Sequence, residues 1–186
     1  MPVLPIVTYD DPVLKRKAET VETDNDELQD LIDDMFETMY NAHGVGLAAP
    51  QVGVSLRLFV VDADVMAEDD ETATKYGPMV FINPELYEIE CEKVEMEEGC
   101  LSIPDIREKV LRPDKVRVKF LDRDFQTSVM KFSSWMARVV QHEYDHIEGV
   151  LFIDYVGSFR KRLLRTKLDQ INAGGLEAEY PLVLKS

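Results

Sequence analysis

Two histidines four residues apart, His142 and His146, enclose a glutamate in the run His-Glu-Tyr-Asp-His. On a helix, residues four apart share a face, so the two imidazoles can bind one metal ion. Glu143 points elsewhere around the axis, but its carboxylate is long enough to reach a metal-bound water and carry its proton. The alternative is an ordinary helix with two partly buried histidines. Because the chain has three histidines in all, the pairing favours metal-dependent hydrolysis.

A catalytic metal site of this kind needs a third protein ligand and an open position for water. The candidates are His43, Cys91, Cys100 and many carboxylates. Cys100 lies in the run Glu-Glu-Gly-Cys-Leu-Ser-Ile-Pro at residues 97–104, which is typical of a turn just after a strand. The residue types alone leave the choice among these candidates open.

A run of mainly small residues, Gly-Val-Gly-Leu-Ala-Ala-Pro-Gln-Val-Gly, occupies positions 44–53. Small residues let the backbone approach another group closely. A phosphate-binding loop is rejected because no Lys-Ser or Lys-Thr pair follows. A glycine-rich turn between a helix and a strand is the alternative at this point.

The histidine motif needs a helix to hold it. The run 133–140 before the motif is predicted to be helical, with Ser133 or Ser134 as its cap and Gly149 as its end. This helix would present both histidines on one face.

The other elements follow from the spacing of apolar residues. A core-packing helix is predicted over 25–42 and is ended by Gly44. The acidic segment 63–78 breaks the pattern and predicts a flexible surface loop. Strands are predicted where apolar residues alternate or run continuously, and Asn83-Pro84 is expected to end one of them. The predicted strands are 56–62, 79–82, 86–96, 106–111, 115–121 and 125–132.

Length and composition limit the class of protein. At 186 residues with 45% hydrophobic residues, the chain is predicted to form one domain over 1–186 with a real core. No run of about 18 apolar residues and no signal-peptide pattern is found, so no membrane partner is expected. The two cysteines predict free thiols in a reducing cytoplasm. The net charge of −15 argues against DNA binding over the whole surface.

Three runs, at residues 44–51, 98–102 and 141–146, are together similar to the three signature motifs of peptide deformylases. They occur in that family's order and at comparable spacing, and the resemblance extends from about residue 5 to residue 155. With the elements above, it predicts an α+β fold. Mixed and antiparallel sheets would pack around the central helix with the His-Glu motif, beside an N-terminal core helix and a C-terminal helix.

The resemblance also implies roles for residues. The metal ligands would be Cys100, His142 and His146, and the general base would be Glu143. The oxyanion would be held by the Gln51 amide and the backbone N–H of Leu101. A water activated by the metal would attack the formyl group of an N-terminal formyl-methionine and release formate.

The resemblance further implies Fe(2+) as the metal, with Zn(2+), Ni(2+) or Co(2+) able to replace it, whereas one Cys and two His alone would suggest zinc. The backbone of Val45 and Gly46 would pair with formyl-Met nascent peptides in strand fashion. Val139 and Trp135 would line an apolar pocket for methionine, or simply pack in the core. The 63–78 segment looks like an insertion that does not touch the chemistry.

Two other functions share parts of this pattern. A zinc peptidase also has His-Glu-x-x-His but takes its third ligand downstream, where Glu148, Glu177 and Glu179 are the candidates. A closed structural metal site would need four protein ligands, and Cys91 would be the fourth.

A basic helix is predicted at 158–173, with Leu164, Leu168 and Ile171 on its apolar face. Its basic residues are Arg160, Lys161, Arg162, Arg165 and Lys167. A basic strip on an acidic protein indicates a polyanion partner, and the substrate suggests the ribosome. The alternative is a helix docked by its leucines with solvated charges outside.

Overall fold

The computed structural model describes residues 2–67, 73–88, 91–175 and 178–183. This part of the chain contains three α-helices, α1 (Asp26–Asn41), α2 (Ser134–Ile147) and α3 (Ser158–Asn172). No helix of the described residues combines the length and the apolar character needed to cross a membrane.

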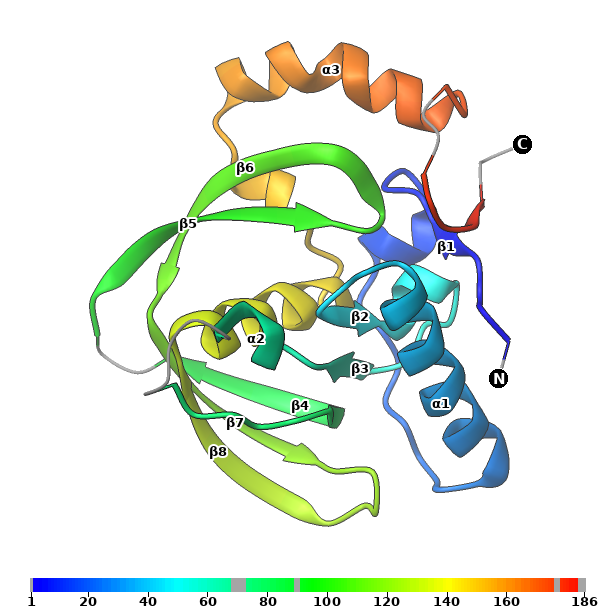
Figure 1. Cartoon of the computed structure of the whole chain (residues 1–186), viewed down its shortest axis with the longest axis vertical. Helices are drawn as coiled ribbons and strands as arrows, with labels where there is room; N and C mark the ends of the chain where they lie inside the picture. Colours follow the sequence, from blue (N-terminus) through cyan, green and yellow to red (C-terminus); the bar gives the residue numbers. More distant parts are fainter. Residues whose placement is uncertain (1, 68–72, 89–90, 176–177, 184–186) are drawn as a thin grey trace.

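The described strands form three sheets. Five make one antiparallel sheet in the order β2–β3–β4–β7–β8, β5 and β6 form a separate hairpin, and β1 pairs in parallel with β9. Their bounds are β1 (Ile6–Val7), β2 (Gly46–Ala48), β3 (Leu58–Val61), β4 (Met79–Glu88), β5 (Lys93–Cys100), β6 (Ile103–Pro113), β7 (Lys115–Leu121), β8 (Thr127–Ser133) and β9 (Leu182–Val183). In Figure 1, α2 lies between the β5–β6 hairpin and the larger sheet, which confirms the predicted α+β class.

The core beneath α2 holds the helix against the larger sheet. Phe59 and Phe81 stack with ring centroids 4.7 Å apart, and both are fully buried. Ala137, Val140 and Ile147 of α2 belong to the same buried cluster. Each large apolar side chain removed from water contributes about 1.5–3 kcal/mol. This packing fixes the rotation of α2, and with it the direction in which the histidines point.

Helix α1 forms where the sequence predicted it and begins as expected. The Asn25 side chain caps it by accepting a hydrogen bond from the backbone N–H of Leu28, 2.8 Å away. Its end differs from the prediction, because His43 and not Gly44 adopts the left-handed conformation, with φ of 54°. The Gly44 N–H then bonds back to the carbonyl of Met39, as in a Schellman cap.

Helix α2 also has one difference from its predicted cap. Ser133 is at the N-cap, but its side chain makes no capping hydrogen bond. The helix ends before Gly149, whose φ of 77° requires glycine. A Cβ there would lie 2.9 Å from the backbone of Arg16, so the close approach of that segment also requires glycine.

The prediction that Asn83-Pro84 ends a strand was wrong. Strand β4 continues through this dipeptide, with a register shift between Ile82 and Glu85. Asn83 has a φ of 49°, and its side-chain amide both accepts from and donates to the backbone of Val21 at 2.8 Å. A bulge held by a distant segment therefore replaces the predicted turn. The predicted strand 86–96 is two strands, β4 and β5, and its residues 89–90 lie outside the described part.

The 63–78 segment is not simply a surface loop in its described part. A short 3-10 helix, Asp64–Ala67, begins it, and Met66 and Tyr76 pack against the core under α2. The Asp64 carboxylate accepts hydrogen bonds from the backbone N–H groups of Tyr76 and Gly77, both at 2.9 Å. Residues 68–72, which include most of the predicted acidic run, lie outside the described residues.

Helix α3 confirms the predicted C-terminal helix. Leu164 and Ile171 are buried and Leu168 packs against the same cluster, so the predicted apolar face docks on the domain. In Figure 1, α3 lies beyond the β5–β6 hairpin, on the side away from α2.

Candidate metal centre and active site

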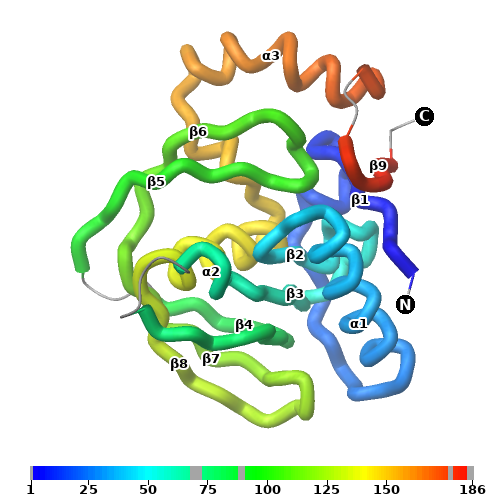
Figure 2. The backbone as a smooth tube through the Cα atoms, in the orientation of Figure 1, coloured from blue at the N-terminus to red at the C-terminus, as the bar shows by residue number. Residues whose placement is uncertain are grey.

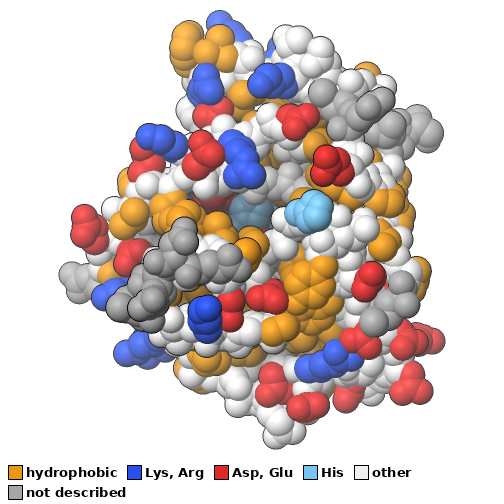
Figure 3. Space-filling model, in the orientation of Figure 1, with side chains coloured by type: hydrophobic (Ala, Val, Ile, Leu, Met, Phe, Trp, Pro, Cys, Tyr) orange, Lys and Arg blue, Asp and Glu red, His pale blue; other side chains and the backbone are white. Residues whose placement is uncertain are grey.

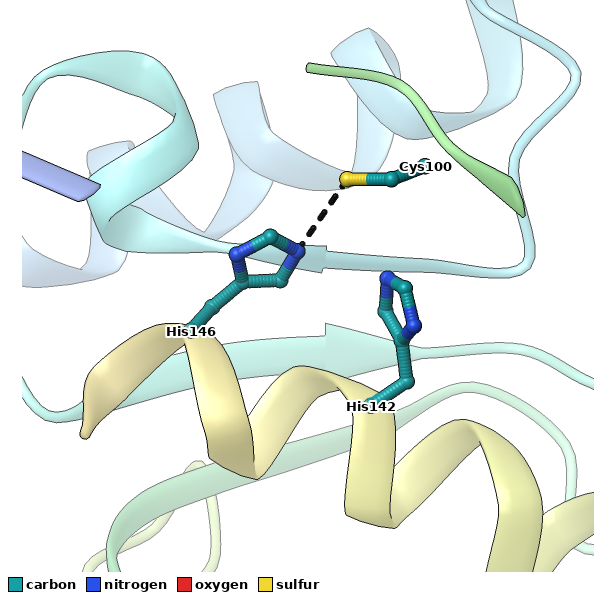
Figure 4. Close-up of side chains that lie close together, drawn as sticks. All are labelled: Cys100, His142 and His146. Carbon is teal, nitrogen blue, oxygen red and sulfur yellow. Dashed lines mark hydrogen bonds between the residues drawn. The ribbon is translucent and has the colours of Figure 1, made fainter. Parts of the chain in front are cut away.

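Three side chains from two elements meet at the predicted metal site. The Sγ of Cys100, at the end of β5, and ring nitrogens of His142 and His146, on α2, all lie within 4.8 Å of one another. The Sγ of Cys100 is 3.3 Å from Nε2 of His146 (Figure 4). The structure therefore brings together the three residues that the motifs predicted as ligands.

The orientation of His142 is set by Glu98. The Nδ1 of His142 lies 2.9 Å from Oε2 of Glu98. Since a carboxylate only accepts, Nδ1 carries the proton and Nε2 is left with its lone pair for a metal. A histidine ligand that donates its other N–H to a carboxylate is a typical metal-site arrangement.

Glu98 is buried because two arginines neutralise it. Its carboxylate accepts from Nε and Nη2 of Arg112, at 2.6 and 3.0 Å, and from Nη1 of Arg138 at 2.8 Å. Arg112 also donates to Asp145 at 2.7 Å. Burial alone would raise the pKa of Glu98, but the hydrogen bonds from His142 and Arg112 hold that pKa well below its usual range. The carboxylate therefore stays ionised and keeps its hold on His142.

Glu143 lies in a drier environment with fewer partners. It is 4% exposed, and this burial raises the pKa of Glu143 to about 7. Its Oε2 has no hydrogen-bond partner among the described residues. Its carboxylate lies against Gly46, where a Cβ would come within 2.5 Å of Oε1. The glycine at position 46 is thus required by the close approach of the glutamate.

Gln51 and Leu101 border the same site. The Ala48 N–H donates to Oε1 of Gln51 at 2.8 Å, which turns the Nε2 of Gln51 toward the site. That Nε2 lies 3.5 Å from the Sγ of Cys100 and 3.4 Å from the Oγ of Ser102. Leu101 follows Cys100 directly, in the turn that joins β5 to β6.

These residues open into a cavity of about 640 Å³. Val45 and Gly46 line it beside Glu143, and the space-filling view shows the face hollowed near its middle, with histidine atoms visible there (Figure 3). Val139 and Trp135 both line the cavity, and Val139 also belongs to the buried cluster under α2. The two roles proposed for Val139 are therefore compatible. Met66 lines the cavity too, so the described part of the 63–78 segment borders the site, and its lack of contact with the chemistry stays a prediction.

The residue set fits a divalent metal ion. It offers one sulfur and two imidazole nitrogens, which are the donors that transition metals prefer. Two buried polar atoms beside it, Oε2 of Glu143 and Nδ1 of His146, have no partner among the described residues. The cluster among those residues that could hold a metal has three members, which would leave a position for water.

Within the described residues, the two alternative sites are not favoured. The thiol of Cys91 lies 3.7 Å from the carbonyl of Lys115 and is not part of the cluster, so no closed four-ligand site forms there. Glu148, a candidate peptidase ligand, instead forms ion pairs with Arg57 at 2.7 Å and Lys17 at 3.2 Å. Glu179 lines the cavity without joining the cluster. Glu177 lies outside the described residues.

Several residues of the site were missed by sequence reasoning. Glu98 was seen as part of a motif but was given no role, and Arg112, Arg138 and Tyr180 were not singled out. Tyr180 donates a hydrogen bond to the carbonyl of Leu101 at 2.8 Å. The sequence holds a weak indication of the two arginines. Arg112 and Arg138 fall on a strand and a helix where the neighbouring inward side chains are apolar, and a buried arginine requires a charged or polar partner.

Comparisons with known proteins agree with this geometry. The family model described as polypeptide deformylase matches residues 3–162. A peptide deformylase of Salinibacter ruber is 51% identical over 186 residues, covering 98% of this chain and 95% of that protein. A peptide deformylase of Cytophaga hutchinsonii is 49% identical over 178 residues, covering 96% of this chain and 95% of that protein.

Solved structures give the same result. The crystal structure of peptide deformylase from Ehrlichia chaffeensis matches with a TM-score of 0.86 and 37% identity, covering 95% of this chain and all of that one. A peptide deformylase from Legionella pneumophila matches with a TM-score of 0.82 and 40% identity, covering 94% of this chain and 98% of that one.

Proposed function

The chain belongs to the peptide deformylase family, and from this premise we propose how its own residues perform the reaction. The function is removal of the N-formyl group from the N-terminal formyl-methionine of new polypeptides, with release of formate. The alternative hypothesis of a zinc peptidase is not favoured.

We propose that Cys100, His142 and His146 hold the metal and that Glu143 is the general acid and base. A divalent ion bound there would polarise the formyl carbonyl and lower the pKa of a water. Glu143 would take a proton from the attacking water and give it to the leaving amine. The observation that carries this assignment is the buried, unpartnered Oε2 of Glu143 beside three converging ligand atoms.

The oxygen of the formyl group would be stabilised by two donors as charge develops on it. We assign these to Nε2 of Gln51 and the backbone N–H of Leu101. In comparable acyl chemistry, each such donor contributes about 3–4 kcal/mol. The bond from the Ala48 N–H to Gln51 supports the assignment, because it leaves the Gln51 amide nitrogen as the group directed at the site.

Substrate would bind by main-chain pairing along Val45 and Gly46, with the methionine side chain in the apolar part of the cavity near Val139 and Trp135. Backbone pairing does not depend on side-chain identity, which suits an enzyme that acts on every formyl-Met chain. The apolar pocket then supplies the selectivity for methionine. These contacts are supported by the lining of the cavity.

The assignment of roles is tested by elemental analysis together with formate release from formyl-Met-Ala-Ser. Cys100→Ser, His142→Ala and His146→Ala are expected to lose metal and activity together. Glu143→Ala is expected to keep its metal and lose activity by about 10²–10⁴-fold, the usual contribution of a positioned acid or base. An active Glu143→Ala variant, or one without metal, would contradict the roles. Cleavage of a blocked peptide by the wild type would favour the peptidase.

We propose Fe(2+) as the working metal, with Zn(2+), Ni(2+) or Co(2+) able to replace it. The donor set accommodates all four, and the choice of iron rests on the family. Cys100 is then the ligand most open to oxidation. Activity of anaerobically purified enzyme should decay in air and persist after nickel substitution. Equal air stability of the two forms would count against iron and leave the deformylase reaction untouched.

We further propose that the enzyme works in the cytoplasm near the ribosome, held by the exposed face of α3. Between residues 159 and 171 this helix carries five basic residues against one acidic residue. Arg160 and Lys161 pair with Glu108 and Asp154, at 2.9 and 3.6 Å. Arg162 and Arg165 are exposed, with no ion pair to another described residue. Polyanionic rRNA is the partner that fits these charges.

The tether is tested by reversing Arg162 and Arg165 to glutamate and measuring co-sedimentation with ribosomes. Binding should fall, and wild-type binding should weaken steeply as salt rises. The matched control reverses Arg117 and Lys131, an exposed cross-strand pair on the larger sheet, which changes net charge equally. If both variants lost ribosome binding equally, the loss would be due to the change in net charge and not to the position of the charges on α3. Unaltered binding of the α3 variant would leave the alternative of a docked helix with solvated charges.

A further inference from the structure

A short segment after α3, residues 178–183, comes back to the active site. Ala178, Glu179 and Tyr180 line the same cavity as the metal ligands. The hydroxyl of Tyr180 donates to the backbone carbonyl of Leu101 at 2.8 Å, across 79 positions of sequence. This segment is also beyond the residues 3–162 that the family model matches. Its role must therefore be argued from its contacts.

The segment is anchored directly after the tyrosine. Strand β9 follows it and pairs in parallel with β1, with Ile6 opposite Leu182 (Figure 2). The Ile6 N–H also donates to the carbonyl of Pro181 at 2.9 Å. Tyr180 and Leu182 pack against the apolar cluster that includes Leu101. The phenol is thus held at a fixed place beside the turn.

The turn that Tyr180 contacts is of a disfavoured kind. Cys100 pairs with Ile103, so Leu101 and Ser102 form a two-residue hairpin loop between β5 and β6. Neither residue has positive φ, whereas the two-residue loops that suit a hairpin need positive φ at one or both positions. The central peptide of such a turn can adopt opposite orientations, as in turn types I and II. Contacts from outside the hairpin must therefore select the observed one.

Two side chains provide those contacts. At Ser102, the second loop residue, the Oγ lies 3.4 Å from Nε2 of Gln51. On the other, the Tyr180 hydroxyl binds the Leu101 carbonyl, which is the oxygen of the central peptide. The N–H of Leu101 belongs to the preceding peptide, between Cys100 and Leu101, and the two peptides meet at the Leu101 Cα. Fixing the central peptide therefore restrains the direction of that N–H.

We propose that Tyr180 is a positioning residue of the active site, whose hydroxyl holds the Leu101–Ser102 turn so that the Leu101 N–H is directed at the developing oxyanion. The proposal rests on the oxyanion role assigned to Leu101 above. The competing role is purely structural, with Tyr180 serving only to dock residues 178–183 on the domain.

The test is Tyr180→Phe, which removes one hydroxyl and keeps the ring. One neutral hydrogen bond biases a conformational equilibrium by about 2- to 10-fold. Outright loss of an oxyanion donor would cost about 10²–10³ in kcat, and here the donor remains but is less well directed. We therefore expect kcat for formyl-Met-Ala-Ser to fall about 3- to 10-fold, with KM changed less than about 2-fold.

The matched control is Tyr9→Phe. The Tyr9 hydroxyl accepts from Asn172 of α3 at 3.0 Å, so this variant also loses one phenol hydrogen bond that holds the C-terminal part of the chain. It is expected to lose similar thermal stability to Tyr180→Phe and to keep wild-type kcat. A role in docking alone would make the two variants alike in kcat.

The proposal is overturned if kcat of Tyr180→Phe stays at the wild-type value, if KM alone changes, if metal is lost, or if Tyr9→Phe lowers kcat equally. Gln51→Ala, measured in parallel, separates this outcome from a failure of its premise. If Gln51→Ala keeps full kcat, the assignment of the oxyanion donors fails. If wild-type enzyme releases no formate, the proposed function itself fails.

Discussion

A methyl group added at Gly46 tests the placement of Glu143 with the smallest possible change. The Cβ of Gly46→Ala would lie 2.5 Å from Oε1 of Glu143, 2.8 Å from Cδ and 2.9 Å from Cγ. Ordinary contact begins at 3.4 Å, so the oxygen must move by the difference, 0.9 Å. Since the backbone φ at Gly46 is not positive, alanine itself is not strained there.

The size of the effect follows from that displacement. Catalytic groups must stay within about 0.5 Å of their productive geometry, and a displacement of about 1 Å can cost about 10²-fold in rate. We therefore expect kcat to fall about 10²-fold, within the 10²–10⁴ that a positioned acid or base contributes. Overpacking of a buried site costs about 1–3 kcal/mol. For a chain of this size, that lowers Tm by roughly 2–12 °C.

The assay measures formate release, metal content and Tm for Gly46→Ala alone and combined with Glu143→Ala. If the methyl group acts by displacing the carboxylate, it should have no further cost in kcat once that carboxylate is absent. Gly157→Ala is the matched control, because nothing lies within 4 Å of its Cβ. Gly44→Ala should give an intermediate loss of kcat, because its Cβ would lie 2.9 Å from the Cδ1 of Leu101 and 3.4 Å from the nearest atoms of Met39.

Two results would refute this reasoning. Wild-type kcat in Gly46→Ala would mean that Glu143 does not need its observed position. A loss that persists in the Glu143→Ala background would mean that the methyl group acts on the substrate, whose main chain is proposed to pair at this strand.

Two further predictions concern stability and the metal. Glu98→Gln should lower metal affinity about 10–100-fold, because His142 loses its orienting carboxylate. It should also cost about 3–5 kcal/mol, because buried Arg112 loses its counter-charge, as thermal unfolding and metal titration would measure. Glu95→Gln, exposed on the same strand, should be within about 0.5 kcal/mol of wild type in the same measurements. Gly149→Ala should lose more than about 1 kcal/mol in denaturant unfolding, because its φ is 77° and its Cβ meets backbone at 2.9 Å; wild-type stability would contradict the strain.

Much of the fold was predictable because the decisive signals are local. Helix α1 has its cap and its apolar periodicity within one stretch, and β7 was predicted with the bounds it has, 115–121. The error at Asn83 has a physical cause. A dipeptide that usually ends a strand is here held in a bulge by hydrogen bonds to Val21, 62 positions away. No local pattern reports that contact.

The site divides in the same way. The spacing of His142 and His146 predicts a shared ligand face because a helix is a local structure. The contact of Glu98 with Arg112 depends on the pairing of β5 with β6, and its contact with Arg138 depends on how α2 lies against that hairpin. These contacts form only when separate elements pack. A sequence therefore indicates which residues could bind a metal or transfer a proton, but not which side chains orient them.

The buried charges around His142 also explain how an acidic protein can keep such a site in order. Two carboxylates, Glu98 and Asp145, face two guanidinium groups, Arg112 and Arg138, so the four charges sum to zero. Because these four charges neutralise one another, their burial does not depend on the positive charge of a metal ion. The bond from Nδ1 of His142 to Glu98 then fixes the ligating tautomer through the protein alone. A metal held there would consequently meet an imidazole that is already oriented, and folding, not metal binding, would order that side chain.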